Sequence, residues 1–345
     1  MFIEQDGWLM PDHFGIPADE YEWVRMSAGL FDLSHRAIVQ FTGADRVSFL
    51  QGMLSNDLRQ LKMFEGQQAT LLTQQGKVVA DLRVLCAMNS IYLDFWEPLK
   101  DKILAHLKRY LVADEVEIND PNEQWKMLSL QGPLANSLLV ELLASMELPA
   151  LPDSHGMFQF DGAPVCVVRA DHTGHDGFDV IVRTEQLEPF AHRLTELGAA
   201  WVGARAQEIL RIEAGIPRYG VDFDEDNLLL EVGLDNAVSF SKGCYLGQEI
   251  VERIRSRGHV NRKLCGLVLE GPTPAASGDR LRRDGHDAGK ITSSVTSFAL
   301  NRPIALGYLH NEYWAEGTGL TVQHADDAIP ATVVKLPFVT ASRGP

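Results

Sequence analysis

Residues 241–249 combine side chains suited to chemistry: they read Ser-Lys-Gly-Cys-Tyr-Leu-Gly-Gln-Glu. Cys244 lies between two glycines, which allow tight turns and the close approach of a ligand. Apolar residues recur at helical spacing over 248–255, which places Cys244 just before a helix N-terminus. The positive end of that helix and the ammonium of Lys242 both favour the thiolate over the thiol. The pattern predicts a reactive cysteine, and the alternative is a buried cysteine in a glycine-rich turn.

The other three cysteines are expected to be small core residues. Cys86, Cys166 and Cys265 lie in apolar, strand-like runs. No two cysteines have the spacing of metal ligands, so we expect no metal site and no iron–sulfur cluster held by this chain alone. Disulfides are not expected in a reducing compartment.

Length and charge narrow the class of protein. The chain has 345 residues, a length that fits two or three domains. Its formal net charge of -16 disfavours nucleic acid or anionic membranes as general partners. Residues 1–10 carry Glu4 and Asp6 and do not resemble a signal peptide. No apolar stretch is long enough to span a bilayer. We therefore expect a cytoplasmic protein.

The pattern of apolar residues indicates one unit that occurs twice. The first copy has a strand at 37–42, a helix at 44–54, strands at 69–73, 78–86 and 91–95, a helix at 98–111 and a strand at 116–118. The second has a strand at 125–130, a helix at 133–145, strands at 158–160, 165–170 and 178–182, a helix at 185–197 and a strand at 200–202. Both copies approximate β-α-β-β-α-β, the ferredoxin-like motif, so we expect an α+β protein.

The pattern of apolar residues changes near residue 261: helical periodicity ends, and short apolar runs alternate with turn signals such as Arg-Asp-Gly at 283–285. This predicts a small C-terminal β-barrel. The expected domains are a first α+β folate-binding unit over 1–120, a second α+β unit with the cysteine motif over 121–260, and the barrel over 261–345. The assignment of folate to the first unit depends on the resemblance described next.

The chain resembles the superfamily of the glycine cleavage T-protein, or aminomethyltransferase, over nearly its whole length. The resemblance is carried by Gly-Leu-Phe-Asp-Leu-Ser-His at 29–35, Gly-Lys-Ile-Thr-Ser at 289–293 and Ile-Ala-Leu-Gly-Tyr at 304–308. The cysteine motif at 242–249 resembles the signature of the YgfZ-type branch, whose folate-binding proteins support iron–sulfur enzymes. Aminomethyltransferases have a different sequence there, without the cysteine. The resemblance implies three domains in a ring around a central site for tetrahydrofolate.

Matching the family motifs residue by residue implies a folate site. Asp81 matches the second aspartate of a Gly-Gly-x-x-Asp-Asp strand near the reactive folate nitrogen, and Ala80 replaces the first. Asp179 matches a carboxylate that grips the pterin, on a shorter arm, and Arg205 matches a site arginine. Tyr219, Glu231 and Lys242 complete the implied folate-binding set.

Elementary chemistry supports these roles beside their structural alternatives. A carboxylate such as Asp179 accepts from the adjacent N–H groups of a pterin edge, and an arginine fork holds a ring carbonyl or the folate tail. Asp81 would orient the folate nitrogen or move a proton. The alternatives are that Asp81 is an exposed strand residue, that Asp179 is a surface acid next to a turn, and that Arg205 caps or pairs with a nearby group. His172 and His175 are expected to be solvated loop residues.

Two functions follow. The first is a tetrahydrofolate-binding protein that supports iron–sulfur cluster assembly or repair, with Cys244 as the reactive group and assembly proteins or client enzymes as partners. The alternative is a folate-dependent aminomethyltransferase or another one-carbon transferase, which the retention of Asp81 and Arg205 favours. A basic island close behind the motif predicts either a solvated helix face or an anion site for a folate tail or a protein partner: Arg253, Arg255, Arg257, Arg262 and Lys263.

Overall fold

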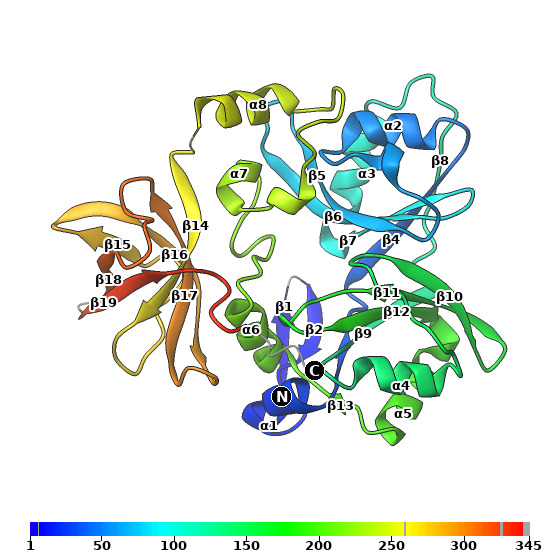
Figure 1. The fold of residues 1–345 in the computed structure, drawn as a ribbon, viewed down its shortest axis with the longest axis horizontal. Coiled ribbons are helices and arrows are strands. Elements are labelled where there is room, and N and C mark those ends of the chain that lie inside the picture. Colours follow the sequence, from blue (N-terminus) through cyan, green and yellow to red (C-terminus); the bar gives the residue numbers. More distant parts are fainter. Residues whose placement is uncertain (6, 259, 325–326, 341–345) are drawn as a thin grey trace. The chain divides into compact units, whose positions relative to one another are not determined.

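The computed structural model describes residues 1–5, 7–258, 260–324 and 327–340 (Figure 1). Residue contacts divide the chain into two compact units. Unit 1 comprises Met1–Asp171, His175–Ala204 and Asn236–Gln248, and unit 2 comprises His172–Gly174, Arg205–Asp235 and Glu249–Pro345. The chain passes between the units several times, so neither is one continuous stretch of sequence.

The first sheet of unit 1 is antiparallel, with the strand order β5-β6-β7-β4-β8. Its elements are β4 (Arg36–Thr42), α2 (Arg46–Met53), η1 (Leu58–Gln60), β5 (Gly66–Leu72), β6 (Val78–Cys86), β7 (Ile91–Trp96), η2 (Glu97–Leu99), α3 (Lys100–Lys108) and β8 (Glu117–Asn119). Side chains alternate between the two faces of a strand, so Leu82 and Val84 of β6 share one face while Asp81 and Arg83 share the other. The order matches the first predicted copy.

The second sheet of unit 1 has the order β10-β11-β12-β9-β3-β13. Its elements are β3 (Gly29–Asp32), β9 (Trp125–Gln131), α4 (Ala135–Leu142), β10 (His155–Phe160), β11 (Ala163–Arg169), β12 (Gly177–Arg183), η3 (Thr184–Gln186), α5 (Leu187–Glu196) and β13 (Ala200–Trp201). Leu139 of α4 and Phe190 of α5 pack with the strands in one hydrophobic core. The second predicted copy is confirmed, with β3 as an addition: it pairs antiparallel with β9 and parallel with β13.

The N-terminal segment forms a two-stranded sheet, β1 (Phe2–Gln5) with β2 (Trp8–Pro11), followed by α1 (Pro17–Met26). Proline suits the first turn of α1 because that turn needs no N–H donor. Glu20 is buried, and one of its carboxylate oxygens accepts hydrogen bonds from the backbone N–H groups of Phe14 and Gly15, both at 2.6 Å. The other oxygen accepts from the N–H of Gly203 at 2.8 Å, which ties this segment to the end of the second sheet.

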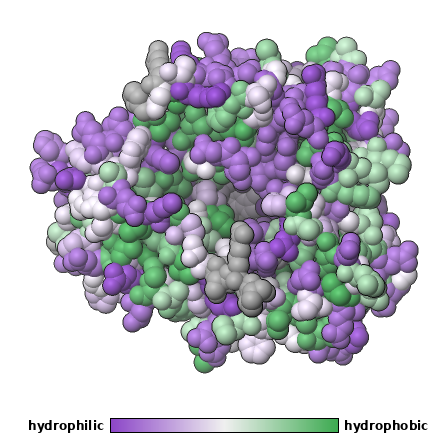
Figure 2. All heavy atoms as spheres, viewed as in Figure 1, coloured by the Kyte–Doolittle hydropathy of each residue, from purple (hydrophilic) through white to green (hydrophobic). Residues whose placement is uncertain are grey.

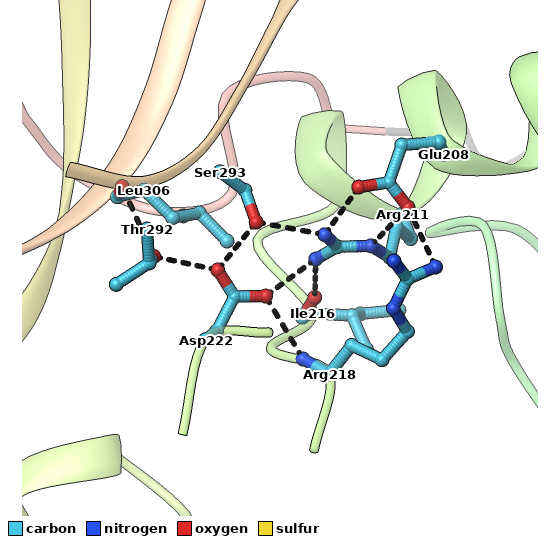
Figure 3. Close-up of polar contacts among 8 residues, drawn as sticks. All are labelled: Glu208, Arg211, Ile216, Arg218, Asp222, Thr292, Ser293 and Leu306. Carbon is cyan, nitrogen blue, oxygen red and sulfur yellow. Dashed lines mark hydrogen bonds and ion pairs between the residues drawn. The ribbon is translucent and has the colours of Figure 1, made fainter. Parts of the chain in front are cut away.

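In unit 2 the helices α6 (Ala204–Glu213), α7 (Leu229–Val232) and α8 (Gln248–Arg257) precede the barrel, and η4 (Asp235–Ala237) lies at the border between the units. Arg211 of α6 donates to Asp222 at 2.7 Å and to Ser293 of the barrel at 2.9 Å (Figure 3). Asp222 also accepts from Thr292 and Ser293, both at 2.6 Å. These charge-assisted contacts hold α6 and the loop after it against the barrel.

The barrel is closed, with the strand order β14-β17-β16-β15-β18-β19. Its strands are β14 (Arg262–Leu269), β15 (Arg280–Arg283), β16 (His286–Ser297), β17 (Arg302–His310), β18 (Gly319–His324) and β19 (Asp327–Val334). Leu267, Leu281 and Val322 are fully buried in its core. The turn between β15 and β16 carries exposed charged residues and forms the hydrophilic projection at the left of Figure 2. The predicted barrel is confirmed, and the chain is an α+β protein.

The two contact units do not follow the boundaries 1–120, 121–260 and 261–345 expected from sequence. The strand β3 belongs to the sheet of β9, and the stretch that carries Cys244 belongs to unit 1. The three-domain division and the ring stay predictions. No helix in the described residues is long and apolar enough to cross a membrane.

Candidate functional site

The four cysteines differ in exposure, and of the three expected in the core only Cys265 is buried. Cys244 is exposed, Cys265 is buried, and Cys86 and Cys166 are half-buried. Burial raises the pKa of Cys166 to about 12 and that of Cys265 to about 11, and it also raises the pKa of Cys86. Since the thiolate is the nucleophile, these three thiols are poorly reactive near neutral pH.

We therefore predict that Cys244 reacts first with iodoacetamide at pH 7.5. At this pH a thiol with a pKa near 11 is almost entirely protonated, with about one thiolate per 1,000 thiols or fewer. Mass-spectrometric mapping of alkylated peptides over time is the measurement. Cys244→Ser should remove the fast phase of labelling and leave the slow phase unchanged. Fast labelling of Cys86, Cys166 or Cys265 in the folded protein would contradict the prediction.

Lys242 has a different role from the one expected. Its Nζ is buried and donates hydrogen bonds to the backbone carbonyls of Gln51, Leu54 and Asn56 at 2.8, 2.7 and 2.8 Å. These carbonyls lie at and just beyond the C-terminal end of α2, where a cation is stabilised by the helix dipole. Burial lowers the pKa of Lys242 to about 8, so the ammonium is still the main form at neutral pH. The charge thus anchors the motif to α2 and is not directed at the Cys244 thiol.

The helix after the motif also begins further from Cys244 than the spacing of apolar residues predicted. α8 begins at Gln248, so three residues separate Cys244 from its first residue. The helix-dipole effect is confined to the first turn, so it contributes less to a thiolate than the sequence suggested.

The rest of the motif contacts α2 and the β5–β6 turn of unit 1. The N–H of Leu246 donates to the carbonyl of Gly52 at 3.0 Å. Gly247 has φ +85°, and a Cβ there would come within 2.6 Å of the carbonyl oxygen of Thr73 in the β5–β6 turn. Only glycine meets both demands without strain. Of the two glycines that flank Cys244 in the motif, Gly247 is thus required by its backbone conformation and by its contact with Thr73.

A hydrogen-bonded path leads from this segment to the strand that carries Asp81. The Ser55 hydroxyl donates to the carbonyl of Ala237 at 2.5 Å, and the Thr70 hydroxyl donates to the Ser55 oxygen at 2.8 Å. Thr70 on β5 is the cross-strand partner of Asp81 on β6. A short path of hydrogen bonds thus joins Ala237, which precedes the cysteine motif, to the strand paired with that of Asp81.

Asp81 lies on β6 of the first sheet. It is half-buried, and burial raises its pKa, while the nearby charge of Arg36 acts in the opposite direction. No ion pair or side-chain hydrogen bond ties it to another residue in the part of the chain that the structure describes. A carboxyl with a raised pKa can hold a proton closer to neutral pH, which suits general acid–base chemistry.

Asp179 has a buried partner that the sequence did not reveal. Its Oδ2 accepts from Nη2 of Arg83 at 2.7 Å, and the same nitrogen donates to Oδ2 of Asp94 at 2.6 Å. Both carboxylates are fully buried, and Arg36 donates to the other oxygen of Asp94 at 2.7 Å. This buried ion cluster joins β6 and β7 of the first sheet to β12 of the second.

Three predicted residues lie in unit 2. Arg205 is exposed in the first turn of α6, and Tyr219 is buried with its ring 5.3 Å from that of Phe223 in an edge-to-face contact. Glu231 is buried on α7 and accepts from Nε of Arg262 at 3.0 Å. Two members of the predicted basic island therefore form ion pairs, Arg262 with Glu231 and Arg255 with Glu252 at 3.7 Å. Their roles toward folate stay predictions.

Sequence reasoning missed Arg83 and Asp94. The available signal was a charged residue within the apolar runs Asp-Leu-Arg-Val-Leu at 81–85 and Tyr-Leu-Asp-Phe-Trp at 92–96. Charged side chains are almost never fully buried unless they are paired, so two opposite charges in neighbouring core strands indicate a buried pair. In the described residues, no group of three or more histidine, cysteine and acidic side chains could hold a metal ion.

Comparisons with known proteins agree with this architecture. A model of the GCVT N-terminal domain matches residues 1–242, and a model of the glycine cleavage T-protein C-terminal barrel domain matches residues 262–340. An aminomethyltransferase of Rubrobacter xylanophilus is 36% identical over 347 residues, covering 99% of this chain and 91% of the relative, and one of Desulfitobacterium hafniense is 32% identical, covering 96% and 92%. The solved structure of glycine cleavage system aminomethyltransferase T from Bartonella henselae is 26% identical with a TM-score of 0.91, covering 99% of this chain and 94% of that one. The chain therefore belongs to the glycine cleavage T-protein family.

Proposed function

We propose that this chain binds a reduced folate and transfers a one-carbon unit, as an aminomethyltransferase does. The observation that carries the proposal is Asp81, a half-buried carboxyl with a burial-raised pKa in the N-terminal family domain. The two similar proteins described above are named aminomethyltransferases, and one of them is 36% identical to this chain. Sequence similarity and the state of Asp81 thus support the same chemistry.

The residues predicted to bind tetrahydrofolate suit that ligand chemically, with a change in one expected role. The Asp81 carboxyl is available to accept a hydrogen bond from a ligand N–H or to give it a proton. Asp179 is fully buried and bound to Arg83, so we assign it the role of positioning Arg83 instead of gripping the pterin directly. Arg205 keeps its predicted role as a partner for a ring carbonyl or for the carboxylates of the folate tail. When bound, the folate would supply the nitrogen that accepts the one-carbon unit.

The test is a glycine-cleavage assay in which the aminomethyl-loaded carrier protein, tetrahydrofolate and this chain are mixed and released ammonia is measured. Replacing a group that moves a proton costs roughly 100-fold or more in rate, so Asp81→Asn should lower kcat/KM by about that factor. The matched control is Asp114→Asn, which changes an exposed carboxyl of the same unit and should be neutral. Absence of folate-dependent ammonia release by the wild type would overturn the transferase proposal.

A second candidate rests on Cys244. We propose that the chain is a YgfZ-type protein that binds tetrahydrofolate and supports assembly or repair of iron–sulfur clusters, with assembly proteins or client enzymes as partners. The exposed thiol on a segment anchored by three hydrogen bonds from Lys242 supports this candidate. Activity of an iron–sulfur enzyme in cells that lack their own homologue is the measurement. Loss of rescue in Cys244→Ser, with folate affinity kept, would favour it, and full rescue would refute it.

A further inference from the structure

A cavity of about 160 Å³ in unit 2 belongs to neither proposed activity. One wall is the loop 220–227, and the other wall is made by β14, β16 and β17 of the barrel. A molecule of liquid water has a share of about 30 Å³, so the space suits a small molecule of a few heavy atoms. Most side chains at its border are polar, including Asp222, Asp224, Arg262, Lys290 and Tyr308.

The barrel wall of the cavity is set by strand register. Lys290 on β16 is directly opposite Tyr308 on β17, so their side chains lie next to each other on one face. The guanidinium of Arg262 on β14 lies over the Tyr308 ring, 5.2 Å from its centroid. This is within the limit of about 6 Å for a cation–π contact. A register shift between Ile291 and Ser293 turns Thr292 toward the same cavity, as bulges do near ligand sites.

The Tyr308 hydroxyl is the strongest indication of a ligand. Tyr308 is 3% exposed, and its hydroxyl has no hydrogen-bond partner within the described residues. A buried hydroxyl without a partner costs free energy, and buried tyrosines normally find one. Burial is also the main cause that raises the pKa of Tyr308, with the Arg262 charge opposing it and the Glu231, Asp222 and Asp224 carboxylates adding to it. The hydroxyl is therefore a neutral donor and acceptor close to several carboxylates.

Most charges at the cavity are already compensated. Asp222 is bound by Arg211 at 2.7 Å and by two barrel hydroxyls (Figure 3). Arg262 is bound by Glu231 at 3.0 Å and by the carbonyl of Asp226 at 3.1 Å. Lys290 and Asp224 remain, both exposed, and neither forms an ion pair with any residue in the described ranges of the chain. Lys290 and Asp224 thus offer one cation and one carboxylate at the same small cavity, whose border also includes Asp226.

We propose that this cavity binds a small zwitterion of the α-amino acid class, with its carboxylate at Lys290 and its ammonium at Asp224. The Tyr308 hydroxyl gains a partner from the same ligand, and Arg262 holds the tyrosine ring in place. Charges of opposite sign at the border of one cavity match the two ends of an amino acid, whereas a simple anion would leave the Asp224 charge without a cation. Lys290, Asp224 and Tyr308 all belong to unit 2 and are not among the residues predicted to bind folate; Arg262 is the member of the cavity border that pairs with a predicted folate residue, Glu231.

Isothermal titration of the full chain with glycine, acetate and methylammonium tests the proposal. Glycine should bind, and acetate and methylammonium should each bind at least about tenfold more weakly, because each lacks one charged end and a charge-assisted contact is worth about that factor. Lys290→Met and Asp224→Asn should each weaken glycine binding by about tenfold or more, and Tyr308→Phe should weaken it without reducing the stability of the fold. The control Lys335→Met removes an exposed lysine of the same unit away from the cavity and should leave binding unchanged.

The outcomes separate the ligand classes. Equal binding of glycine and acetate would identify an anion site and overturn the zwitterion. Glycine binding that survives both Lys290→Met and Asp224→Asn would place the ligand elsewhere and overturn the site. No binding of glycine or of the larger amino acids alanine and serine at millimolar concentrations would overturn the proposal altogether. None of these results depends on whether folate binds.

Discussion

Replacing Arg83 with methionine is expected to lower the free energy of unfolding by about 3–5 kcal/mol, the usual cost of removing one partner from a buried ion pair. The substitution leaves Asp179 fully buried beside Asp94 without the shared cation. Arg36 still pairs with Asp94 at 2.7 Å, so the carboxylate that loses most from the substitution is that of Asp179. Urea denaturation followed by fluorescence and circular dichroism is the measurement.

The pH dependence distinguishes an unpaired charge from a simple packing defect. Protonation of Asp179 removes its charge, so the loss of stability in Arg83→Met should be largest near pH 7 and should shrink toward pH 4. The double variant Arg83→Met with Asp179→Asn should recover part of the loss at pH 7. The control Arg193→Met changes an exposed pair with Glu196 and should cost less than about 0.5 kcal/mol. A pH-independent loss would contradict the ion-cluster interpretation.

The second large effect is expected for Asp222→Ala, which should lower the free energy of unfolding of unit 2 by about 3 kcal/mol. Asp222 is 2% exposed and accepts hydrogen bonds from Arg211, Thr292 and Ser293 and from the N–H of Arg218. Glu208 still pairs with Arg211, so the guanidinium is not left alone and the cost stays below that of a fully isolated charge.

Hydrogen exchange resolved by mass spectrometry locates this effect. Faster exchange in Asp222→Ala should appear in α6 and in the loop 216–224 before it appears in the barrel core, since these are the segments that the carboxylate joins to β16. The matched control is Asp287→Ala, an exposed acid 3.6 Å from Arg280 in the same unit, which should be close to neutral. If hydrogen exchange in Asp222→Ala became faster to the same extent throughout the barrel, Asp222 would not act mainly as a local link between α6, the loop and β16.

Apolar periodicity was sufficient to predict most of the fold. The strands β6, β9 and β12 and the helix α5 lie within a few residues of their predicted ranges, because each has one clear buried face. The strand β3 was missed because four residues, Gly-Leu-Phe-Asp, are too few to show alternation. It forms because β9 and β13 offer it partners on both sides, which is a long-range effect.

The candidate site shows the same limit. Chemistry-bearing residues such as Cys244 and Asp81 could be selected by type and motif. The partners that set their surroundings come from distant segments: α2 supplies the carbonyls for Lys242, and β6 supplies Arg83 for Asp179. Sequence spacing predicts what lies on one strand or helix face, but it does not predict which other face packs against it. The roles assigned to Lys242 and Asp179 changed for that reason.

The pairing of β3 with β9 has a consequence for how the chain folds during translation. All strands of the first sheet lie between Arg36 and Asn119, so this sheet can close while translation continues. β3 ends at Asp32, but its partner β9 begins only at Trp125. Synthesis at about 5–20 residues per second delays that partner by roughly 5–20 s. During that interval an apolar Gly-Leu-Phe strand leaves the exit tunnel unpaired, which makes the N-terminal segment the natural point of contact for chaperones on the nascent chain.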